Sequence, residues 1–325
     1  MLFTIDKAKK IIEKEIEKHT FGEHPNELYE PIRYIMSIGG KRMRPILMIL
    51  SYRLFNEDLK KCIKPAIAAE AFHNFTLMHD DIMDDAPLRR GKPTVHEKWD
   101  VNTAILSGDV MLVKTYELLL TVEKKYLHDF LHLFNTMAAR VCEGQQMDMN
   151  FEKREDVTLD EYMEMIKRKT AELLAFCMEA GALLAGADSK NRQLLKDCGY
   201  HAGIAFQLMD DLLDLYGDAH IFGKTVGGDI VANKKTYLLL TALSRAKEND
   251  KEKLKQLLSL DGIYAEEKIK EVKKIFDKLE VRTITELKIN EYFEKAFQCL
   301  RKTEASMMHK NQLKKYLETL SNRNQ

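Results

Sequence analysis

Apolar residues recur three and four positions apart along most of the chain, as one face of an α-helix requires. Strict alternation of apolar and polar residues, the pattern of a half-buried strand, is scarce. The spacing predicts helices over residues 4–19, 26–37, 43–55, 64–85, 101–122, 127–150, 159–185, 189–215, 234–248, 250–258, 263–281, 283–303 and 306–320. We therefore expect an all-α fold.

Two of these helices are apolar almost all round, over "PAIAAEAFHNFTLM" (65–78) and "GYHAGIAFQLM" (199–209). Helices of this kind belong at the centre of a large bundle. No polar linker of low complexity divides the chain, so the pattern predicts a single domain over residues 1–325. The helical pattern breaks at 86–98 and 216–233, and ordered loops of that length are usually functional.

Composition narrows the class of protein. Lysine plus arginine and aspartate plus glutamate both number 51, so the zero net charge offers no global attraction to nucleic acid or to a membrane. The five cysteines form no C-x-x-C pair, which indicates a reduced interior without a disulfide framework or a zinc site. The amphipathic N-terminus is unlike a signal peptide, and no apolar run is long enough for stable membrane insertion. We expect a cytoplasmic enzyme.

Acidic residues follow each apolar helix in the same order, in "FTLMHDDIMD" (75–84) and "FQLMDDLLD" (206–214). Asp80 and Asp84 are four apart on one helical face, and so are Asp210 and Asp214. Like charges at that spacing destabilise a helix, and carboxylates in a last turn oppose its dipole. A Mg²⁺ site explains why aspartates stand here despite both destabilising effects, because Mg²⁺ binds a few carboxylates together with waters and substrate phosphates. Either cluster alone also fits a solvated helix end; a di-iron site would need Glu-x-x-His ligands that these helices lack.

Basic residues gather around these clusters. In "GGKRMRP" (39–45) two glycines precede a helix, and Lys41 and Arg44 are expected on its first turn, where amides and cations together bind phosphate. Adjacent arginines, as at Arg89 and Arg90, bind a diphosphate through bidentate contacts. The same hypothesis uses Lys169 with Thr170, although Lys169 also fits a solvated surface. It also uses Lys224 and Lys234, which flank a glycine-rich segment after the second acidic cluster. Acids for metals, bases for phosphates and an apolar core together predict a substrate with a diphosphate head and an apolar tail.

The motifs "GGKRMRP", "HDDIMDDAPLRRG", "KT" at 169–170, "FQLMDDLLD" and "GKTVGGDIVANK" occur in the order and approximate spacing of the trans-isoprenyl (polyprenyl) diphosphate synthases. The resemblance covers essentially the whole chain. It implies an all-α isoprenoid synthase bundle with a deep central cavity, usually a homodimer. It also implies three Mg²⁺ ions and head-to-tail condensation of isopentenyl diphosphate with an allylic diphosphate of C5 to C15.

The resemblance also assigns roles to residues. It implies metal ligation by Asp80, Asp84, Asp210 and Asp214, with Asp81 in support. The isopentenyl diphosphate site would comprise Lys41, Arg44, His73 and Arg90. The allylic diphosphate site would comprise Arg89, Lys169, Thr170, Gln207, Lys224 and Lys234. Of these, Arg89, Lys169 and Lys224 would take part in catalysis with the aspartates.

Phe75 lies five residues before Asp80, about 7.5 Å deeper along the helix at 1.5 Å per residue. In the family an aromatic residue here tends to close the cavity floor, although core filler would look the same in the sequence. Thr76 beside it is small and would close the cavity less tightly, so we expect a product of C15 to C20.

The alternatives are a longer-chain synthase, a non-catalytic subunit on the same fold, or a terpene cyclase, which would usually alter the second acid motif. An HD-type phosphohydrolase would leave the second acid motif and "GGKRMRP" unexplained.

Overall fold

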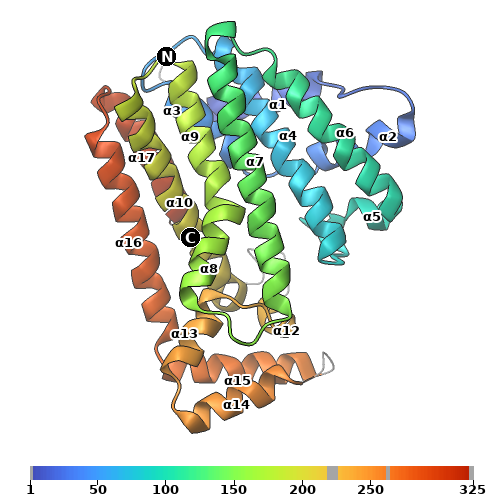
Figure 1. The fold of residues 1–325 in the computed structure, drawn as a ribbon, viewed down its shortest axis with the longest axis vertical. Helices are drawn as coiled ribbons and strands as arrows, with labels where there is room; N and C mark the ends of the chain where they lie inside the picture. Colours follow the sequence, from blue (N-terminus) through green and yellow to red (C-terminus); the bar gives the residue numbers. More distant parts are fainter. Residues whose placement is uncertain (1–2, 218–225, 261–263, 322–325) are drawn as a thin grey trace. The chain divides into compact units, whose positions relative to one another are not determined.

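The computed structural model describes residues 3–217, 226–260 and 264–321, and these residues are almost entirely helical (Figure 1). This confirms the predicted all-α fold. The chain divides into two compact units. Unit 1 comprises residues 1–135, 176–196 and 303–316, and unit 2 comprises 136–175, 197–302 and 317–325. The single domain over residues 1–325 stays a prediction. No described helix is long and apolar enough to cross a membrane.

Unit 1 is built around α4. Its complete elements are α1 (Ile5–Lys18), α2 (Asn26–Ser37), α3 (Met43–Tyr52), α4 (Lys60–Met83), β1 (Leu88–Arg89), β2 (Lys92–Pro93), α5 (Val95–Lys98) and α6 (Val101–Leu119). The whole apolar run 65–72 of α4 is buried, and α4 packs mainly against α6 and α3. The predicted central position of this helix is therefore confirmed within its unit.

Unit 2 contains the second acidic motif. Its complete elements are α8 (Leu159–Ile166), the π-helix η1 (Lys167–Ala171), α12 (Gly228–Val231), α13 (Tyr237–Arg245), α14 (Glu248–Leu258), α15 (Ala265–Lys278) and α16 (Val281–Lys302). Residues 202–206, before the motif, are all buried. Figure 1 shows α14 and α15 side by side, and their residues are in contact. Parts of α7 (Lys124–Glu152), α9 (Glu172–Leu184), α10 (Ser189–Tyr216) and α17 (Met307–Ser321) belong to each unit.

Side-chain caps explain where several helices begin. Asp100 accepts from the backbone N–H of Thr103 at the start of α6. Thr158 and Glu161 form a reciprocal capping box at α8, which satisfies two N–H groups that the helix itself cannot. Thr236 caps α13 in the same way as Asp100 caps α6, so this helix begins at Tyr237 rather than at residue 234 as predicted.

Three further local predictions are wrong. The segment 159–185 is not one α-helix but α8, η1 and α9, because the N–H of Glu172 bonds to the carbonyl of Lys167 five residues back. The segment 86–98 is not wholly irregular: β1 and β2 pair antiparallel and α5 follows. Lys41 is not on the first turn of α3, since that helix begins at Met43.

Candidate active site

The first acidic motif ends α4 in unit 1. Asp80 is half-buried, and Asp84, the C-cap residue of α4, is exposed. Their spacing places both carboxylates on one side of the last turn. Asp85 is exposed as well and has a left-handed backbone with φ 48°. The two predicted metal ligands are therefore open to a ligand from solvent.

Asp81 differs from its neighbours, because only 2% of its surface is exposed. Arg89 donates to it from Nε, at 2.9 and 2.8 Å from the two carboxylate oxygens, and from Nη2 at 2.6 Å. Arg89 lies in β1, so this ion pair fastens the β1–β2 hairpin to the end of α4. The supporting role of Asp81 at a metal site stays a prediction. Arg89, predicted to bind the allylic diphosphate, is paired here with the Asp81 carboxylate.

The predicted phosphate-binding turn lies beside the second arginine of the hairpin. Arg90 donates through Nη1 to the carbonyl oxygen of Gly39. Gly40 has φ +135°, a backbone conformation that favours glycine, and a Cβ there would lie 2.7 Å from Arg90 Nη1, so the guanidinium would have to shift. Arg44 occupies the first turn of α3 directly after it. Within unit 1 the fold thus brings together the turn, Arg44 and Arg90.

His73 on α4 belongs to the same basic region. Loss of water contact lowers its pKa well below the usual value, and the positive charges of Arg44, Arg90 and Arg89 lower it further. The imidazole is therefore neutral near pH 7. This electrostatic coupling supports the predicted grouping of His73 with Arg44 and Arg90.

Arg42, between Lys41 and Arg44, was not among the predicted site residues. It is 3% exposed and has a left-handed backbone with φ 49°. Its guanidinium donates to Glu70 at 2.9 Å, to Glu13 at 3.0 Å and to the carbonyl of Met36 at 2.6 Å. This buried cluster ties the turn to α1, α2 and α4. An arginine inside a basic motif gives no sequence signal of such a role.

The second acidic motif, in unit 2, repeats the arrangement of the first. Asp210 is exposed, Asp211 is 6% exposed, and Asp214 is half-buried. Asp211 accepts from Gln207 Nε2 at 2.9 Å, from the backbone N–H of Tyr237 at 3.4 Å and from the Tyr162 hydroxyl. In each motif the second acid of the pair is buried and anchored, while the first is more accessible.

Burial raises the pKa of Asp211 to about 6, although its hydrogen bonds oppose the rise. The Tyr162 pKa is raised well above its usual value by burial and by the Asp211 carboxylate. Gln207 continues the network, because its Oε1 accepts from the Thr170 hydroxyl at 2.8 Å. Thr170 and Gln207, predicted for one substrate site from positions 37 residues apart, are therefore in direct contact. Tyr162 was missed, since a tyrosine on an amphipathic helix usually indicates only core packing.

Lys169 lies in the π-helix η1, and its Nζ pairs with Asp148 at 2.6 Å. A Cβ on Gly144 of α7 would lie 2.3 Å from the backbone nitrogen of Lys169, so α7 meets η1 backbone to backbone. Short π-helical turns in α-helices occur frequently at functional sites.

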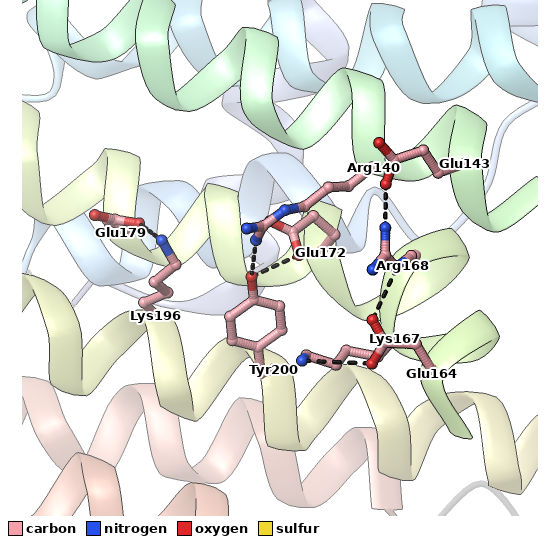
Figure 2. A network of polar contacts seen from close by, with 9 residues as sticks. All are labelled: Arg140, Glu143, Glu164, Lys167, Arg168, Glu172, Glu179, Lys196 and Tyr200. Carbon is pink, nitrogen blue, oxygen red and sulfur yellow. Dashed lines mark hydrogen bonds and ion pairs between the residues drawn. The ribbon is translucent and has the colours of Figure 1, made fainter. Parts of the chain in front are cut away.

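Charged side chains of unit 2 surround η1. Figure 2 shows Arg168 donating to both Glu143 and Glu164. It also shows Arg140 and Glu172 bonded to the Tyr200 hydroxyl, at 3.1 and 2.5 Å. These pairs connect η1 and the start of α9 to α7, α8 and α10.

The segment after the second motif returns to Asp214. The backbone N–H of Asp229 donates to Asp214 Oδ2 at 3.0 Å, and the N–H of Lys234 donates to the Asp229 carbonyl at 2.9 Å. Lys234 is half-buried close to this turn. Lys224 lies outside the described residues.

The donor set fits Mg²⁺. All four predicted ligands are carboxylates, and none of them is as deeply buried as the neighbouring Asp81 and Asp211. Within residues 3–217, 226–260 and 264–321, no group of three or more His, Cys, Asp or Glu side chains could hold a metal ion. Each motif alone therefore offers a pair of carboxylates rather than a closed cage, which suits an ion that also binds phosphate oxygens and water.

Phe75 is half-buried within a group of aromatic rings in unit 1. Its ring centroid lies 4.8 Å from that of His79 and 5.7 Å from that of Phe72, which in turn lies 5.2 Å from Phe134. Thr76 donates its hydroxyl to the His73 carbonyl at 2.8 Å. The deep central cavity and the role of Phe75 as its floor stay predictions.

A family model, related sequences and solved structures all indicate the same protein family. The polyprenyl synthetase family model matches residues 25–279. A short chain isoprenyl diphosphate synthase of Methanocaldococcus jannaschii is 38% identical over 82% of this chain and 81% of its own. A geranylgeranyl diphosphate synthase of Methanosarcina mazei is 40% identical over 70% of both. The crystal structure of a geranylgeranyl pyrophosphate synthase superposes with a TM-score of 0.95 at 40% identity, covering 100% of both chains.

The chain belongs to the polyprenyl synthetase family. It is a prenyltransferase with the all-α isoprenoid synthase fold, which confirms the predicted enzyme class, the fold and the condensation to a trans-prenyl diphosphate. Members of this family depend on Mg²⁺. The roles of individual site residues stay predictions.

Proposed function

We propose that this enzyme adds isopentenyl diphosphate to allylic diphosphates of C5 to C15 and releases a prenyl diphosphate of about C20. The observation that supports the proposal is that each unit by itself contains a group of predicted site residues in contact or electrostatically coupled. Unit 1 gathers Arg44, Arg90 and His73 at the glycine turn, and unit 2 joins Thr170, Gln207 and the second acidic motif. The geranylgeranyl diphosphate synthases among the relatives support the product length.

The basic group in unit 1 would bind isopentenyl diphosphate. Arg44 and Arg90 offer planar guanidinium groups that pair with phosphate oxygens, and Lys41 adds a third cation. His73 is neutral in the free protein because its pKa is depressed, so it donates one ring N–H without adding to the positive charge. The arginines hold the diphosphate, and the neutral imidazole adds a hydrogen bond.

Other cations and polar groups would bind the allylic diphosphate. Lys169 and Lys234, with Arg89 and Lys224, supply cations, and Thr170 and Gln207 supply hydrogen bonds. Asp80, Asp84, Asp210 and Asp214 would hold Mg²⁺, three ions in all when the diphosphate is bound. When bound, Mg²⁺ neutralises charge on the diphosphate and makes it a better leaving group.

The chain's own residues then act by position and charge. The lysines and arginines stabilise the negative charge that develops as the C–O bond of the allylic diphosphate breaks. The carbon–carbon double bond of isopentenyl diphosphate attacks the resulting allylic cation, and the departing diphosphate takes the proton that is lost. Apolar side chains around the reacting groups would exclude water, which would otherwise capture the cation.

The test is an incubation series with the purified protein. Isopentenyl diphosphate, Mg²⁺ and one C5, C10 or C15 allylic diphosphate are supplied, and product lengths are read by mass spectrometry. We expect elongation from all three primers, ending at C20. Products that continue well beyond C20 would favour the longer-chain alternative. Absence of Mg²⁺-dependent elongation from every primer would overturn the proposal.

We also propose a homodimer formed through α6. Leu106, Val113 and Leu120, each seven residues apart, are 58%, 57% and 62% exposed, and Ile105 and Tyr116 adjoin them. A row of large apolar side chains at this spacing is typical of a helix that packs against a second helix. Light scattering should give a dimer mass, and Val113→Glu should give a monomer. A monomeric wild type would contradict the dimer but not the chemistry.

For location we infer the cytoplasm. Cys62, Cys177 and Cys198 are buried free thiols, which suits a reducing compartment. Fractionation with a marker enzyme tests this inference.

A further inference from the structure

Lys268, on α15 in unit 2, is a buried cation that the proposed chemistry does not use. Only 1% of its surface is exposed. A buried lysine ammonium is costly unless charges or hydrogen bonds compensate for the lost water. Burial accordingly lowers the pKa of Lys268 below its usual value. Some structural gain must offset that cost.

All three acceptors recorded for Lys268 Nζ are uncharged oxygens. They are Asn233 Oδ1 at 2.8 Å and the carbonyls of Val231 and Leu258, both at 3.4 Å. Val231 and Leu258 are the last residues of α12 and α14. The last carbonyls of a helix have no intrahelical donor and carry partial negative charge, so a cation placed there is stabilised without a carboxylate.

The third acceptor, Asn233, links the lysine to the segment beside the second acidic motif. Asn233 has a left-handed backbone with φ 54° and immediately precedes Lys234. Lys268 thus holds the end of the segment 227–234, and α12 within this segment packs against α15. Since three N–H groups are needed for three acceptors, the ammonium form suits this position.

The other end of the same segment is fastened to Asp214. The N–H of Gly227 donates to the Asp214 carbonyl at 2.7 Å, and the N–H of Asp229 donates to its carboxylate. The segment is therefore held between a predicted metal ligand at its start and Lys268 at its end. Lys234, predicted for the allylic diphosphate site, follows directly after the residue that Lys268 holds.

We propose that Lys268 is a positioning residue: it fixes segment 227–234 so that the Asp229 amide stays on Asp214 and Lys234 stays at the allylic diphosphate site. This inference rests on the proposed function for its kinetic consequence. The local ordering that it describes is a property of the free protein and can be measured separately.

The first test is hydrogen exchange on the full-length protein. Lys268→Met keeps an unbranched side chain and removes the charge and the donors. We expect backbone amides of residues 227–236 to exchange about tenfold faster or more in this variant. Asn233→Gly, which removes the same hydrogen bond and tolerates the left-handed backbone, should give the same local change. Lys270→Met is the matched control, because Lys270 is exposed on the same helix, and should leave the exchange unchanged.

The second test compares kinetics. In Lys268→Met the KM for the allylic diphosphate should rise on the order of tenfold, while the KM for isopentenyl diphosphate stays within about twofold. Lys268→Arg, which restores the charge, should recover most of the loss. Equal rises in both KM values, together with faster exchange throughout unit 2, would show a merely structural role and overturn the proposal. Unchanged exchange at 227–236 would also overturn it.

These readouts separate the two claims. If the wild type shows no elongation, the proposed function fails, and the exchange data still decide whether Lys268 orders the segment. If elongation occurs and Lys268→Met leaves both the exchange and the allylic KM unchanged, the function stands and the positioning role is wrong.

Discussion

Arg89 donates hydrogen bonds from both Nε and Nη2 to the buried carboxylate of Asp81, at distances between 2.6 and 2.9 Å. The pair closes the β1–β2 hairpin onto the end of α4, directly beside Asp80 and Asp84. The motif therefore contains two kinds of aspartate: Asp81 is buried and paired with Arg89, whereas Asp80 and Asp84 are more exposed. Mutations should separate these two kinds.

Asp81→Asn should destabilise the protein. The change removes the charge that pairs with Arg89 and leaves a buried amide with an imperfect partner, which we expect to lower the free energy of unfolding by about 2 kcal/mol. Urea unfolding followed by circular dichroism measures it. Asp85→Asn is the control, since Asp85 is exposed, and should change stability by less than about 0.5 kcal/mol. Equal stability of the two variants would contradict the anchoring role.

Asp80→Ala and Asp210→Ala should lower turnover and leave stability nearly unchanged. Both carboxylates are accessible, so their loss should leave the melting temperature nearly unchanged, while turnover falls on the order of 10³-fold. Steady-state assays with Mg²⁺ and a C15 primer, next to a thermal melt, measure both. Asp85→Ala should keep near-normal turnover. Wild-type turnover in either Asp80→Ala or Asp210→Ala would refute the metal assignment.

The depressed pKa of His73 should make the free energy of unfolding depend on pH. The folded protein depresses the pKa of His73, so below about pH 6.5 the unfolded chain binds a proton that the folded chain does not. The free energy of unfolding should therefore fall as the pH is lowered from 7 to 5, with a contribution from His73 of at most about 1.4 kcal/mol per pH unit. His73→Gln should show a shallower decline in urea midpoints measured at pH 5, 6 and 7. An identical slope would show that His73 titrates normally.

Gly144→Ala should disturb the π-helix. The added Cβ would lie 2.3 Å from the Lys169 backbone nitrogen, so α7 and η1 must separate. We expect a loss of stability of about 1–3 kcal/mol and a raised KM for the allylic diphosphate. Thermal melts and kinetics test this. The matched control is Ala138→Gly, a change of one methyl elsewhere on α7, which should leave the allylic KM unchanged.

Phe75→Ala should lengthen the product. If the Phe75 ring closes the tail site, its removal opens space for one or two further C5 units, and C25 or C30 products should appear by mass spectrometry. Because the ring also contacts Phe72 and His79, stability should fall by about 2 kcal/mol. Leu77→Ala, two residues along α4 on another face, controls for a general loosening of the helix. An unchanged product distribution would show that Phe75 is only core filler.

Much of the fold could be predicted because helical periodicity is a local property. The runs 65–72 and 202–206 are buried as their composition requires. The capped helices begin at or near the first residues predicted for them. The π-helix could not be predicted, because its residues fit an α-helical pattern and its close approach to Gly144 involves a different helix. The β1–β2 hairpin is stabilised by Asp81, which lies on α4 eight residues before its partner Arg89, so the sequence of the hairpin itself gives too weak a signal.

The sequence by itself determined which chemical groups are present: paired acids, paired arginines, a glycine turn and apolar helices. Residue types and their spacing specify these features without knowledge of the fold. Only the tertiary structure decided which acids are more exposed and which are buried. Asp80 and Asp81 are adjacent and chemically identical, but only Asp81 is buried against the guanidinium of Arg89, eight residues further along the chain. The same holds for Lys268, whose burial follows from helix ends that meet in space and from nothing in its neighbouring sequence.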